Sequence, residues 1–143
     1  MPSQFHCRRR VEFADTDMAG IVHFSRFFVF MEATEHAFLR SLGLSVHLER
    51  DGQTISWPRL AAACDYRRPV RFEDELEISL HIERLGNKSV TYGVAFEHEG
   101  EAVADGTLTA ACCLCDPGVP LRAIPIPDFI RQRFEAPETA SGP

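Results

Sequence analysis

One stretch of the chain, residues 25–42, has the spacing of a long amphipathic helix and limits the folds that this sequence can adopt. Ser25 is a favourable N-cap residue, and Gly43 suits the position just after a helix end. The apolar residues that fall near helical spacing between them are Phe27, Phe28, Met31, Phe38, Leu39 and Leu42, with Ala33 and Ala37 among them. The pattern predicts one helix of about five turns, which is long for a small domain.

Much of the remaining chain has the two-residue period of β-strands. In residues 75–85, "ELEISLHIERL", leucine and isoleucine alternate with polar residues, as in an antiparallel strand with one buried face. Short turns then lead into two more alternating segments, "SVTYGVAFEHEG" and "AVADGTLTAACCLCD". Two earlier strands are expected over residues 5–13 and about 56–67, the second with Pro58 near its start and Pro69 just past its end.

The order of these elements predicts an α+β fold: a strand, the long helix, and then four antiparallel strands in meander order. One helix and one antiparallel sheet bury their apolar faces together when the sheet wraps around the helix. We therefore expect an antiparallel five-stranded sheet around one long central helix, in a single domain spanning residues 1–136. Residues 124–134 predict a short terminal segment with a helical turn, and residues 137–143 a disordered tail.

The charge and the hydropathy of the chain argue against several classes of partner. The formal net charge is −6, without the basic excess that a nucleic-acid-binding protein normally shows. No apolar run approaches the roughly 20 residues that span a bilayer, and the N-terminus lacks the apolar core of a secretory signal. We therefore expect a cytoplasmic protein with neither a nucleic-acid partner nor a membrane partner.

The five cysteines are odd in number, and three of them crowd into "ACCLCD" at residues 111–116. Zinc sites usually pair a C-x-x-C motif with a second such pair or with histidines further along the chain, and the sequence has neither arrangement. The pattern favours buried strand cysteines in a reducing compartment, with no metal site.

The segment "FADTDMAGIVHFSRFF", residues 13–28, places Asp15, Asp17 and Gly20 just before the predicted helix. The spacing D-x-D-x-x-G also begins a calcium-binding EF-hand loop. However, Ala19 and Arg26 stand where that loop needs an oxygen ligand and a glutamate. Helix capping explains one acid, because a carboxylate is favourable beside the positive end of a helix. Capping leaves the glycine and the second acid unexplained.

A reactive role explains more of this segment. The first turn of a helix presents unpaired backbone N–H groups, which can stabilise the oxyanion of a carbonyl under attack. Gly20 allows a tight turn and a close approach of a ligand to the backbone. A carboxylate a few residues upstream can then attack that carbonyl or activate a water molecule against it, so the segment favours acyl transfer.

The same residues carry a resemblance to a known family. The segment "VEFADTDMAGIVHFSRFFVFMEATEHAFLRSLGL" resembles the N-terminal half of the 4-hydroxybenzoyl-CoA thioesterase family of hotdog-fold proteins, which is marked by D-x-D-x-x-G-x-V before a long central helix. The likeness continues through "DYRRPVRFEDELEI" and "LGNKSVTYGVAF", over roughly residues 8–115. It implies a hotdog fold and hydrolysis of acyl-CoA thioesters without a metal or another cofactor. It also implies a homodimer or homotetramer with active sites at the subunit interface.

The resemblance implies roles for individual residues. Asp17, the second acid of the motif, corresponds to the catalytic aspartate, which acts as a nucleophile or as a general base. The N–H groups that polarise the thioester carbonyl correspond to the first helical turn, around His23 and Phe24. The side chain of His23 either contacts the substrate or Asp17, or only packs at the helix start. The residues implied to lie beside the substrate are Gly20, Ile21 and Val22.

Other residues are assigned with their alternatives. Asp15 is expected to hold the loop by accepting hydrogen bonds from backbone N–H groups, in the manner of an Asx turn. Lys88 and Ser89 fall where relatives present a basic loop to the CoA phosphates, although surface turns often carry a lysine without such a role. Trp57 either lines the acyl pocket or packs in the core. The other basic residues that could bind the same phosphates are Arg67, Arg68 and Arg71.

Two questions stay open at the level of the sequence. Glu32, Glu35 and His36 share one neighbourhood on the helix, and in other hotdog subfamilies the catalytic acid lies there, so either glutamate is a rival base. The other interpretation is a solvated or subunit-facing polar edge. Besides an acyl-CoA thioesterase, the fold allows another chemistry, such as that of a hydratase or dehydratase, or a non-catalytic acyl-CoA binding protein. The sequence lacks the G-x-S-x-G elbow of serine hydrolases.

Overall fold

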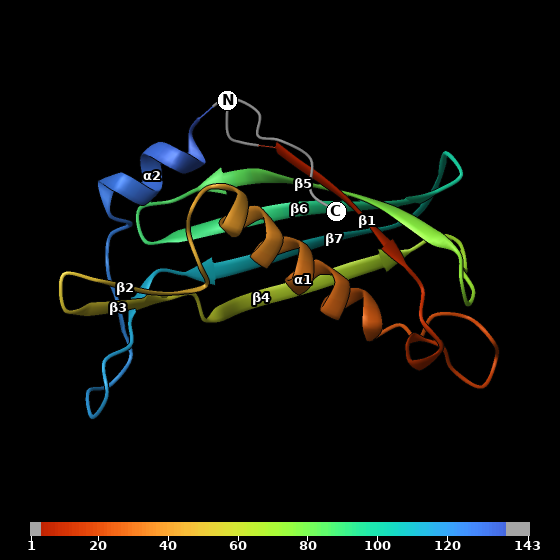
Figure 1. The fold of residues 1–143 in the computed structure, drawn as a ribbon, viewed down its shortest axis with the longest axis horizontal. Coiled ribbons are helices and arrows are strands. Elements are labelled where there is room, and N and C mark those ends of the chain that lie inside the picture. Colours follow the sequence, from red (N-terminus) through yellow and green to blue (C-terminus); the bar gives the residue numbers. More distant parts are fainter. Residues whose placement is uncertain (1–3, 137–143) are drawn as a thin grey trace.

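The structure is a computed structural model, and it describes residues 4–136 of the 143-residue chain (Figure 1). Its helices are α1 (Arg26–Ser41) and α2 (Asp128–Phe134), and a short 3-10 turn, η1, spans Phe13–Asp15. The strands are β1 (Gln4–Arg10), β2 (His47–Arg50), β3 (Gln53–Ser56), β4 (Arg59–Tyr66), β5 (Glu75–Leu85), β6 (Ser89–His98), β7 (Glu101–Ala111), β8 (Cys113–Leu114) and β9 (Arg122–Ala123).

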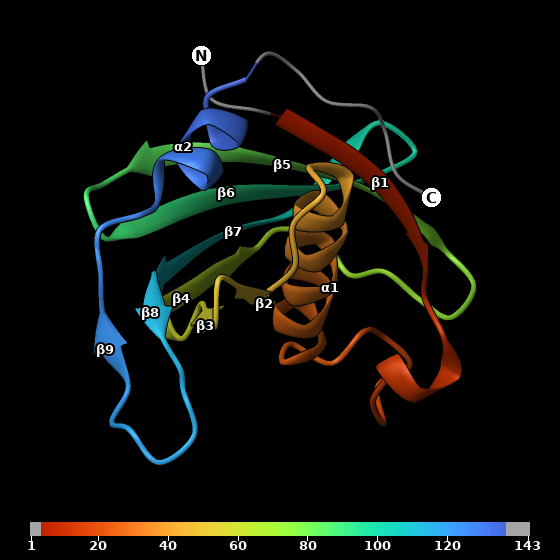
Figure 2. The ribbon, with the colours of Figure 1, turned by 60° about the vertical axis from the view of Figure 1, so that its left-hand side comes forward.

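The main sheet is antiparallel and five-stranded, and it curves around α1 (Figures 1 and 2). This confirms the predicted arrangement of one sheet around one long helix. Its strand order is β1-β5-β6-β7-β4, so the prediction of four consecutive strands in meander order was wrong. After β4 the chain runs alongside Ile21 and Val22, and β5 then pairs with β1. Because of this crossing, β4 lies at the sheet edge beside β7.

The central helix lies almost where its sequence pattern predicts. Ser25 occupies the N-cap position, and Gly43 has the left-handed φ of 74° that suits the residue after a helix end. On β7, Gly106 lies beneath Met31, where a Cβ atom would collide with the Met31 sulfur. A glycine at this position therefore lets the helix approach the sheet closely. The large apolar residues that α1 buries are Phe27, Phe30, Met31, Phe38 and Leu39.

A second, small sheet with the order β2-β3-β8-β9 was not predicted. Its strands are two to four residues long, too short to show a clear hydrophobic period. The strand expected over residues 56–67 is interrupted at Trp57 and Pro58, where the chain leaves β3 and enters β4. The last long strand likewise ends at Ala111, after which β8 joins the small sheet.

The terminal segment closes one end of the helix. The predicted helical turn is confirmed as α2, whose Phe134 stacks on Phe38 with the ring centroids 6.1 Å apart. The ring of Trp57 packs against that of Phe134, with the centroids 5.8 Å apart. The C-terminal half of α1 is thereby buried beneath α2 and the start of β4.

The cysteines are free thiols, and Cys112 and Cys113 are buried as predicted, whereas the other three are partly exposed. Burial raises the pKa of the Cys112 thiol to about 12, so this group is an inert thiol. Over residues 4–136, no helix is long and apolar enough to cross a membrane. The same residues contain no group of three or more His, Cys, Asp or Glu side chains that could hold a metal ion. The tail predicted over residues 137–143 lies outside the described residues.

Candidate active site

The acidic motif folds into a tight loop at the N-terminal end of α1. Thr16 and Val22 form a β-bridge, and the Asp17 N–H donates to the Ile21 carbonyl at 2.9 Å. The Gly20 N–H donates to the Asp17 carbonyl at 2.9 Å, and Gly20 has a left-handed φ of 81°. The turn therefore needs the glycine that the motif supplies, as predicted from the sequence.

Asp17 has one engaged carboxylate oxygen and one free one. Its Oδ1 accepts a hydrogen bond from the Ala19 N–H at 2.8 Å and a longer one from the Ile21 N–H at 3.5 Å. No described residue hydrogen-bonds to Oδ2. Asp15 does accept a hydrogen bond from a backbone N–H, that of Glu12 at 2.8 Å, as predicted, but the Asx turn itself is made by Asp17 with the Ala19 N–H. This turn fixes the carboxylate while it leaves an oxygen available for chemistry.

Asp17 lines a pocket of about 520 Å³, which is within the range of small-molecule sites. The pocket lies between the loop, the start of α1 and the segment that follows β4. Ile21 and Val22, two of the residues implied to lie beside the substrate, line it, whereas Gly20 shapes the turn behind them. The other lining residues are Phe24, Phe27, Tyr66, Arg67, Arg68, Pro69 and Val70.

The two backbone N–H groups named from the resemblance differ in availability. The His23 N–H donates to the Asp15 carbonyl at 2.9 Å. The Phe24 N–H has no acceptor among the described residues. The carbonyl of Phe24 accepts a hydrogen bond from the Tyr66 hydroxyl at 3.0 Å, which steadies this turn from the side of the sheet. Of the two groups, the Phe24 N–H is therefore the one that can polarise a bound carbonyl.

The side chain of His23 engages the start of the helix. Its Nδ1 accepts a hydrogen bond from the Ser25 N–H at 3.2 Å and lies 2.8 Å from the Ser25 hydroxyl. Its ring stacks on Phe24 with the centroids 4.6 Å apart. Within the described residues no hydrogen bond or ring contact joins His23 to Asp17, and a contact of His23 with the substrate stays a prediction.

Three of the residues assigned to substrate binding lie elsewhere in the chain. Trp57 is buried and packs on Phe134, so in this chain it belongs to the core. Lys88 and Ser89 lie where β5 turns into β6, at the opposite end of the sheet from Asp17 (Figure 1). Their side chains are exposed and half-buried, respectively. A role of these two residues at the Asp17 pocket is not visible within one chain.

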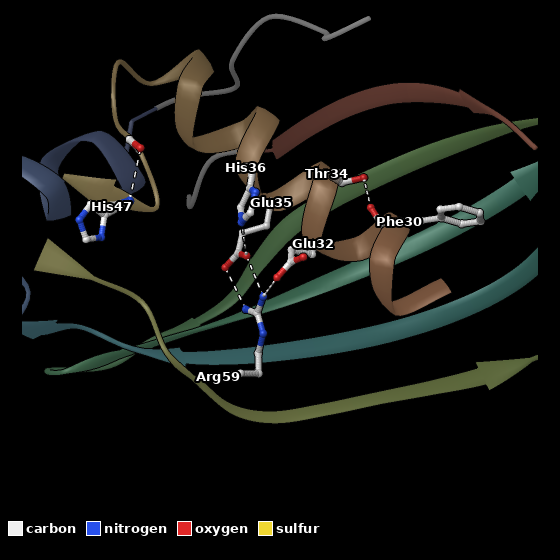
Figure 3. Close-up of polar contacts among 8 residues, drawn as sticks. Phe30, Glu32, Thr34, Glu35, His36, His47 and Arg59 are labelled. Carbon is white, nitrogen blue, oxygen red and sulfur yellow. Dashed lines mark hydrogen bonds and ion pairs between the residues drawn. The ribbon is translucent and has the colours of Figure 1, made fainter. Parts of the chain in front are cut away.

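Of the two rival bases on the helix, Glu35 is committed to an ion pair with Arg59, whereas the side chain of Glu32 is 57% exposed (Figure 3). Glu35 is 1% exposed, and its two oxygens accept hydrogen bonds from the two terminal nitrogens of Arg59 at 2.9 and 3.0 Å. His36 lies 3.8 Å from one of these oxygens, and Glu32 lies 4.0 Å from Arg59. Neither glutamate lines the Asp17 pocket. Both oxygens of Glu35 are thus occupied, whereas Oδ2 of Asp17 has no hydrogen-bond partner among the described residues.

The basic residues after β4 are partnered by acids. Arg67 donates to Asp105 at 2.6 Å, and Arg68 forms an ion pair with Glu101 at 2.9 Å. Both arginines line the pocket, and both ion pairs are solvent-exposed, so they can exchange partners readily. Arg71 does not line the pocket. Its side chain reaches the Asp17 loop, where one terminal nitrogen lies 3.5 Å from the Gly20 carbonyl.

The sequence reasoning missed Phe27, Tyr66 and Val70 as pocket residues. Tyr66 is the last residue of β4, and no residue of this strand is buried. The strand therefore lacks the alternation of apolar and polar residues that would indicate which side chains face the pocket. The ring of Tyr66 packs edge-on against Phe27 at 5.4 Å, and its hydroxyl holds the Phe24 carbonyl. In the sequence, Tyr66 is marked by its position directly before the two arginines and the proline of "YRRP".

Comparison with known proteins identifies relatives of this chain. The model of the thioesterase-like superfamily matches residues 11–134. A protein of Aquifex aeolicus (strain VF5) is 37% identical over 100 residues, which cover 70% of this chain and 77% of that protein. A 1,4-dihydroxy-2-naphthoyl-CoA hydrolase of Trichodesmium erythraeum (strain IMS101) is 30% identical over 112 residues, covering 77% and 81%. The solved structure of a gentisyl-coenzyme A thioesterase superposes with a TM-score of 0.77 at 27% identity, covering 90% of this chain and 98% of that chain.

Proposed function

The chain belongs to the thioesterase-like superfamily, and we propose that it hydrolyses an acyl-CoA thioester to a free acid and coenzyme A. The membership confirms the resemblance drawn from the acidic motif. One observation carries the proposed activity. Asp17, from the loop, and Phe24, from the helix start, line one pocket, and within the described residues Asp17 Oδ2 has no hydrogen-bond partner and the Phe24 N–H has no acceptor.

The proposed reaction uses these two groups on opposite sides of one carbonyl. The Phe24 N–H donates to the thioester oxygen, which becomes negatively charged as the carbonyl carbon is attacked. The Asp17 carboxylate either attacks that carbon itself or removes a proton from an attacking water molecule. The carbon–sulfur bond then breaks, and coenzyme A leaves as its thiolate. If Asp17 attacks directly, water hydrolyses the acyl–aspartate anhydride in a second step.

We further propose an aromatic acyl group. Three aromatic rings, those of Phe24, Phe27 and Tyr66, line the pocket, and Phe27 and Tyr66 already pack edge-on. Aromatic rings favour such offset and edge-on contacts with another ring. The two relatives whose names state a substrate, a naphthoyl-CoA hydrolase and a gentisyl-CoA thioesterase, support the same class.

A second copy of the chain is proposed to complete the site. The edge strand β4 pairs on one side only, and none of its residues is buried, with Leu60 64% exposed. Phe24, at the pocket, is 62% exposed as well. An exposed apolar edge invites pairing with another chain. We propose that two β4 edges meet in a homodimer, and that Lys88 and Ser89 bind CoA phosphates across the interface of such an assembly.

The test is a thiol-release assay with the purified protein and a panel of acyl-CoA thioesters. Benzoyl-CoA, hydroxylated benzoyl-CoAs, acetyl-CoA and palmitoyl-CoA span the aromatic, short and long classes. We expect the highest kcat/KM with the aromatic thioesters. Release of thiol from none of them, by a protein that is folded, would contradict the proposed activity. A preference for palmitoyl-CoA would contradict only the acyl class.

A further inference from the structure

Asp15, the first acid of the motif, is completely buried, yet it does not line the pocket. It is one of only three polar or charged residues that are buried among the described residues. A buried carboxylate is costly unless its oxygens are satisfied. Each of its oxygens therefore needs a partner, and the partners identify what Asp15 holds.

The side chain of Asp15 joins two segments that flank the loop. Its Oδ1 accepts a hydrogen bond from Arg26 Nε at 2.9 Å and forms an ion pair with a terminal nitrogen of the same guanidinium at 2.8 Å. Its Oδ2 accepts from the Glu12 N–H at 2.8 Å. Glu12 precedes the 3-10 turn, and Arg26 is the first residue of α1. The carboxylate thus ties the helix start to the backbone that leads into the loop.

The backbone of the same residues frames the peptide unit that carries the Phe24 N–H. The His23 N–H donates to the Asp15 carbonyl at 2.9 Å, and the His23 carbonyl accepts from the Arg26 N–H at 2.9 Å. Arg26 therefore holds the carbonyl of the peptide unit that carries the Phe24 N–H, and Asp15 holds the N–H of the peptide unit just before it. These two residues are in turn linked through their side chains.

Stability alone gives little reason for this pair. Replacing a buried ion pair with apolar residues of similar volume is often neutral or stabilising, because both charges lose their hydration. What the charge-assisted contact of Arg26 with one Asp15 oxygen, together with the Glu12 N–H on the other, provides is a fixed distance and direction between two backbone segments. Those segments carry the Asp17 loop and the Phe24 N–H, which must lie on the two sides of one carbonyl.

We propose that Asp15 and Arg26 are positioning residues, which set the Phe24 N–H relative to the Asp17 carboxylate without touching the substrate. This role rests on the proposed thioester hydrolysis. Misplacement of a catalytic group by about 1 Å can reduce a rate roughly 100-fold. Loss of the pair should therefore lower kcat, while the pocket residues that bind the acyl group keep KM nearly unchanged.

The test compares Arg26→Met with Arg8→Met, which removes an arginine from an exposed pair with Glu77 on β1 and β5. We expect Arg26→Met to lower kcat roughly 10- to 100-fold at a temperature where it is fully folded, with KM within about twofold. Arg26→Lys should recover part of the rate, because an ammonium group can still reach one Asp15 oxygen. Arg8→Met should keep the parental kcat. If Arg26→Met does not fold, Asp15→Asn serves instead, because it leaves no unpaired buried charge.

A second measurement does not depend on turnover. In nitrogen-15 NMR spectra of Arg26→Met, the amide signals of Phe24 and of the Asp17 loop should shift and exchange with solvent faster, whereas those of β6 should not. Unchanged signals, or a kcat that falls only in proportion to the folded fraction, would overturn the positioning role. A parental protein without thioesterase activity would overturn the proposed function instead, and the NMR comparison would still decide whether the pair holds the loop.

Discussion

Two carboxylates beside α1, Asp17 and Glu35, are held in opposite ways. Asp17 has one oxygen bound by backbone N–H groups and one free oxygen at a pocket of about 520 Å³. Glu35 has both oxygens bound by Arg59 and is 1% exposed. Both acids adjoin the same helix, and in the sequence both were candidates for the reactive base. This difference in hydrogen-bond partners and in access to a pocket is the basis for proposing Asp17 rather than Glu35 as the catalytic acid.

The two ends of the helix differ in the same sense. The C-terminal half is closed by Trp57 and by Phe134 of α2. The N-terminal end is open, with Phe24 62% and Tyr66 45% exposed around it. Within the described residues, the buried pair of Glu35 and Arg59 in the closed half is internal to the fold, whereas Asp17 at the open end lines a pocket.

The largest effect is expected from Asp17→Asn. Asparagine keeps the size and one acceptor oxygen, so the Asx turn and the fold should persist, but the carboxylate that attacks or activates water is lost. We expect kcat to fall by about 100-fold or more in the thiol-release assay. Asp51→Asn, at an exposed turn between β2 and β3, is the matched control and should keep full activity. A loss of only a few-fold in Asp17→Asn would show that another group is the catalytic acid.

Arg59→Met should reverse this pattern, lowering stability and leaving the chemistry intact. It leaves Glu35 buried without its partner, which typically costs 3–5 kcal/mol. Because the Arg59 side chain is 27% exposed, we expect the low end, about 3 kcal/mol, in urea unfolding. The kcat of the folded protein should stay within about twofold of the parent. If Arg59→Met instead abolished turnover in fully folded protein, the ion pair would belong to the active site.

The double variant Glu35→Leu with Arg59→Met is the control for this interpretation. It removes both charges together, so no unpaired carboxylate remains in the core. We expect its unfolding free energy to return to within about 1 kcal/mol of the parent. A double variant as unstable as Arg59→Met would show that lost packing of the Arg59 stem, and not the unpaired charge, causes the destabilisation.

The open end should depend on a second chain. Leu60→Lys places a charge on the unpaired edge of β4, where the proposed homodimer forms, and should yield a species near the monomer mass of 16.1 kDa in light scattering. Its activity per chain should fall by about tenfold, the effect of an incomplete site. Leu121→Lys, an equally apolar exposed position away from β4, should change neither quantity. If the parental protein were a fully active monomer on dilution, the proposal of a site shared between two chains would be wrong.

The features that the sequence revealed are local ones. The helix and the long strands follow from hydrophobic periods within single segments, and the Gly20 turn follows from a spacing of a few residues. The features that it could not reveal join distant segments. Arg59 lies 24 residues from Glu35, and the pairing of β4 with β7 depends on the path of the chain after Tyr66. No period in one segment encodes either contact.

The candidate site shows the same division. Asp17 and the helix start belong to one motif, so they were found together. Tyr66 reaches the pocket from an edge strand without alternation, and its partner, the Phe24 carbonyl, is 42 residues away. The commitment of Glu35 to Arg59 was equally hidden, so the sequence left Asp17 and Glu35 as alternatives. Only the three-dimensional partners separate them.

The smallest effect is expected at the turn between β6 and β7, where His98 forms ion pairs with partners that reach solvent. His98 donates a hydrogen bond through Nδ1 to the Glu75 carbonyl at 3.0 Å, and this bond raises the pKa of His98 above its ordinary value of 6.5. Asp74 at 3.7 Å and Glu99 at 3.5 Å also favour the charged imidazole. Because the pKa is raised in the folded state, the stabilisation is fully present below about pH 6.5. It is lost as the pH rises through the folded pKa.

His98→Gln should therefore be less stable than the parent at pH 5.5 by about 1 kcal/mol or less, the range of exposed ion pairs, and equal to it at pH 9. Thermal unfolding of both proteins across this pH range measures the difference. Repeating the series in 1 M salt should shrink the difference, since exposed charges are screened there. A gap that widened toward high pH would mean that the neutral imidazole, and not the charged one, is the stabilised form. A difference of several kcal/mol in unfolding free energy at pH 5.5 would contradict this prediction. It would show that the ion pairs of His98 are as strong as the buried pair of Glu35 and Arg59.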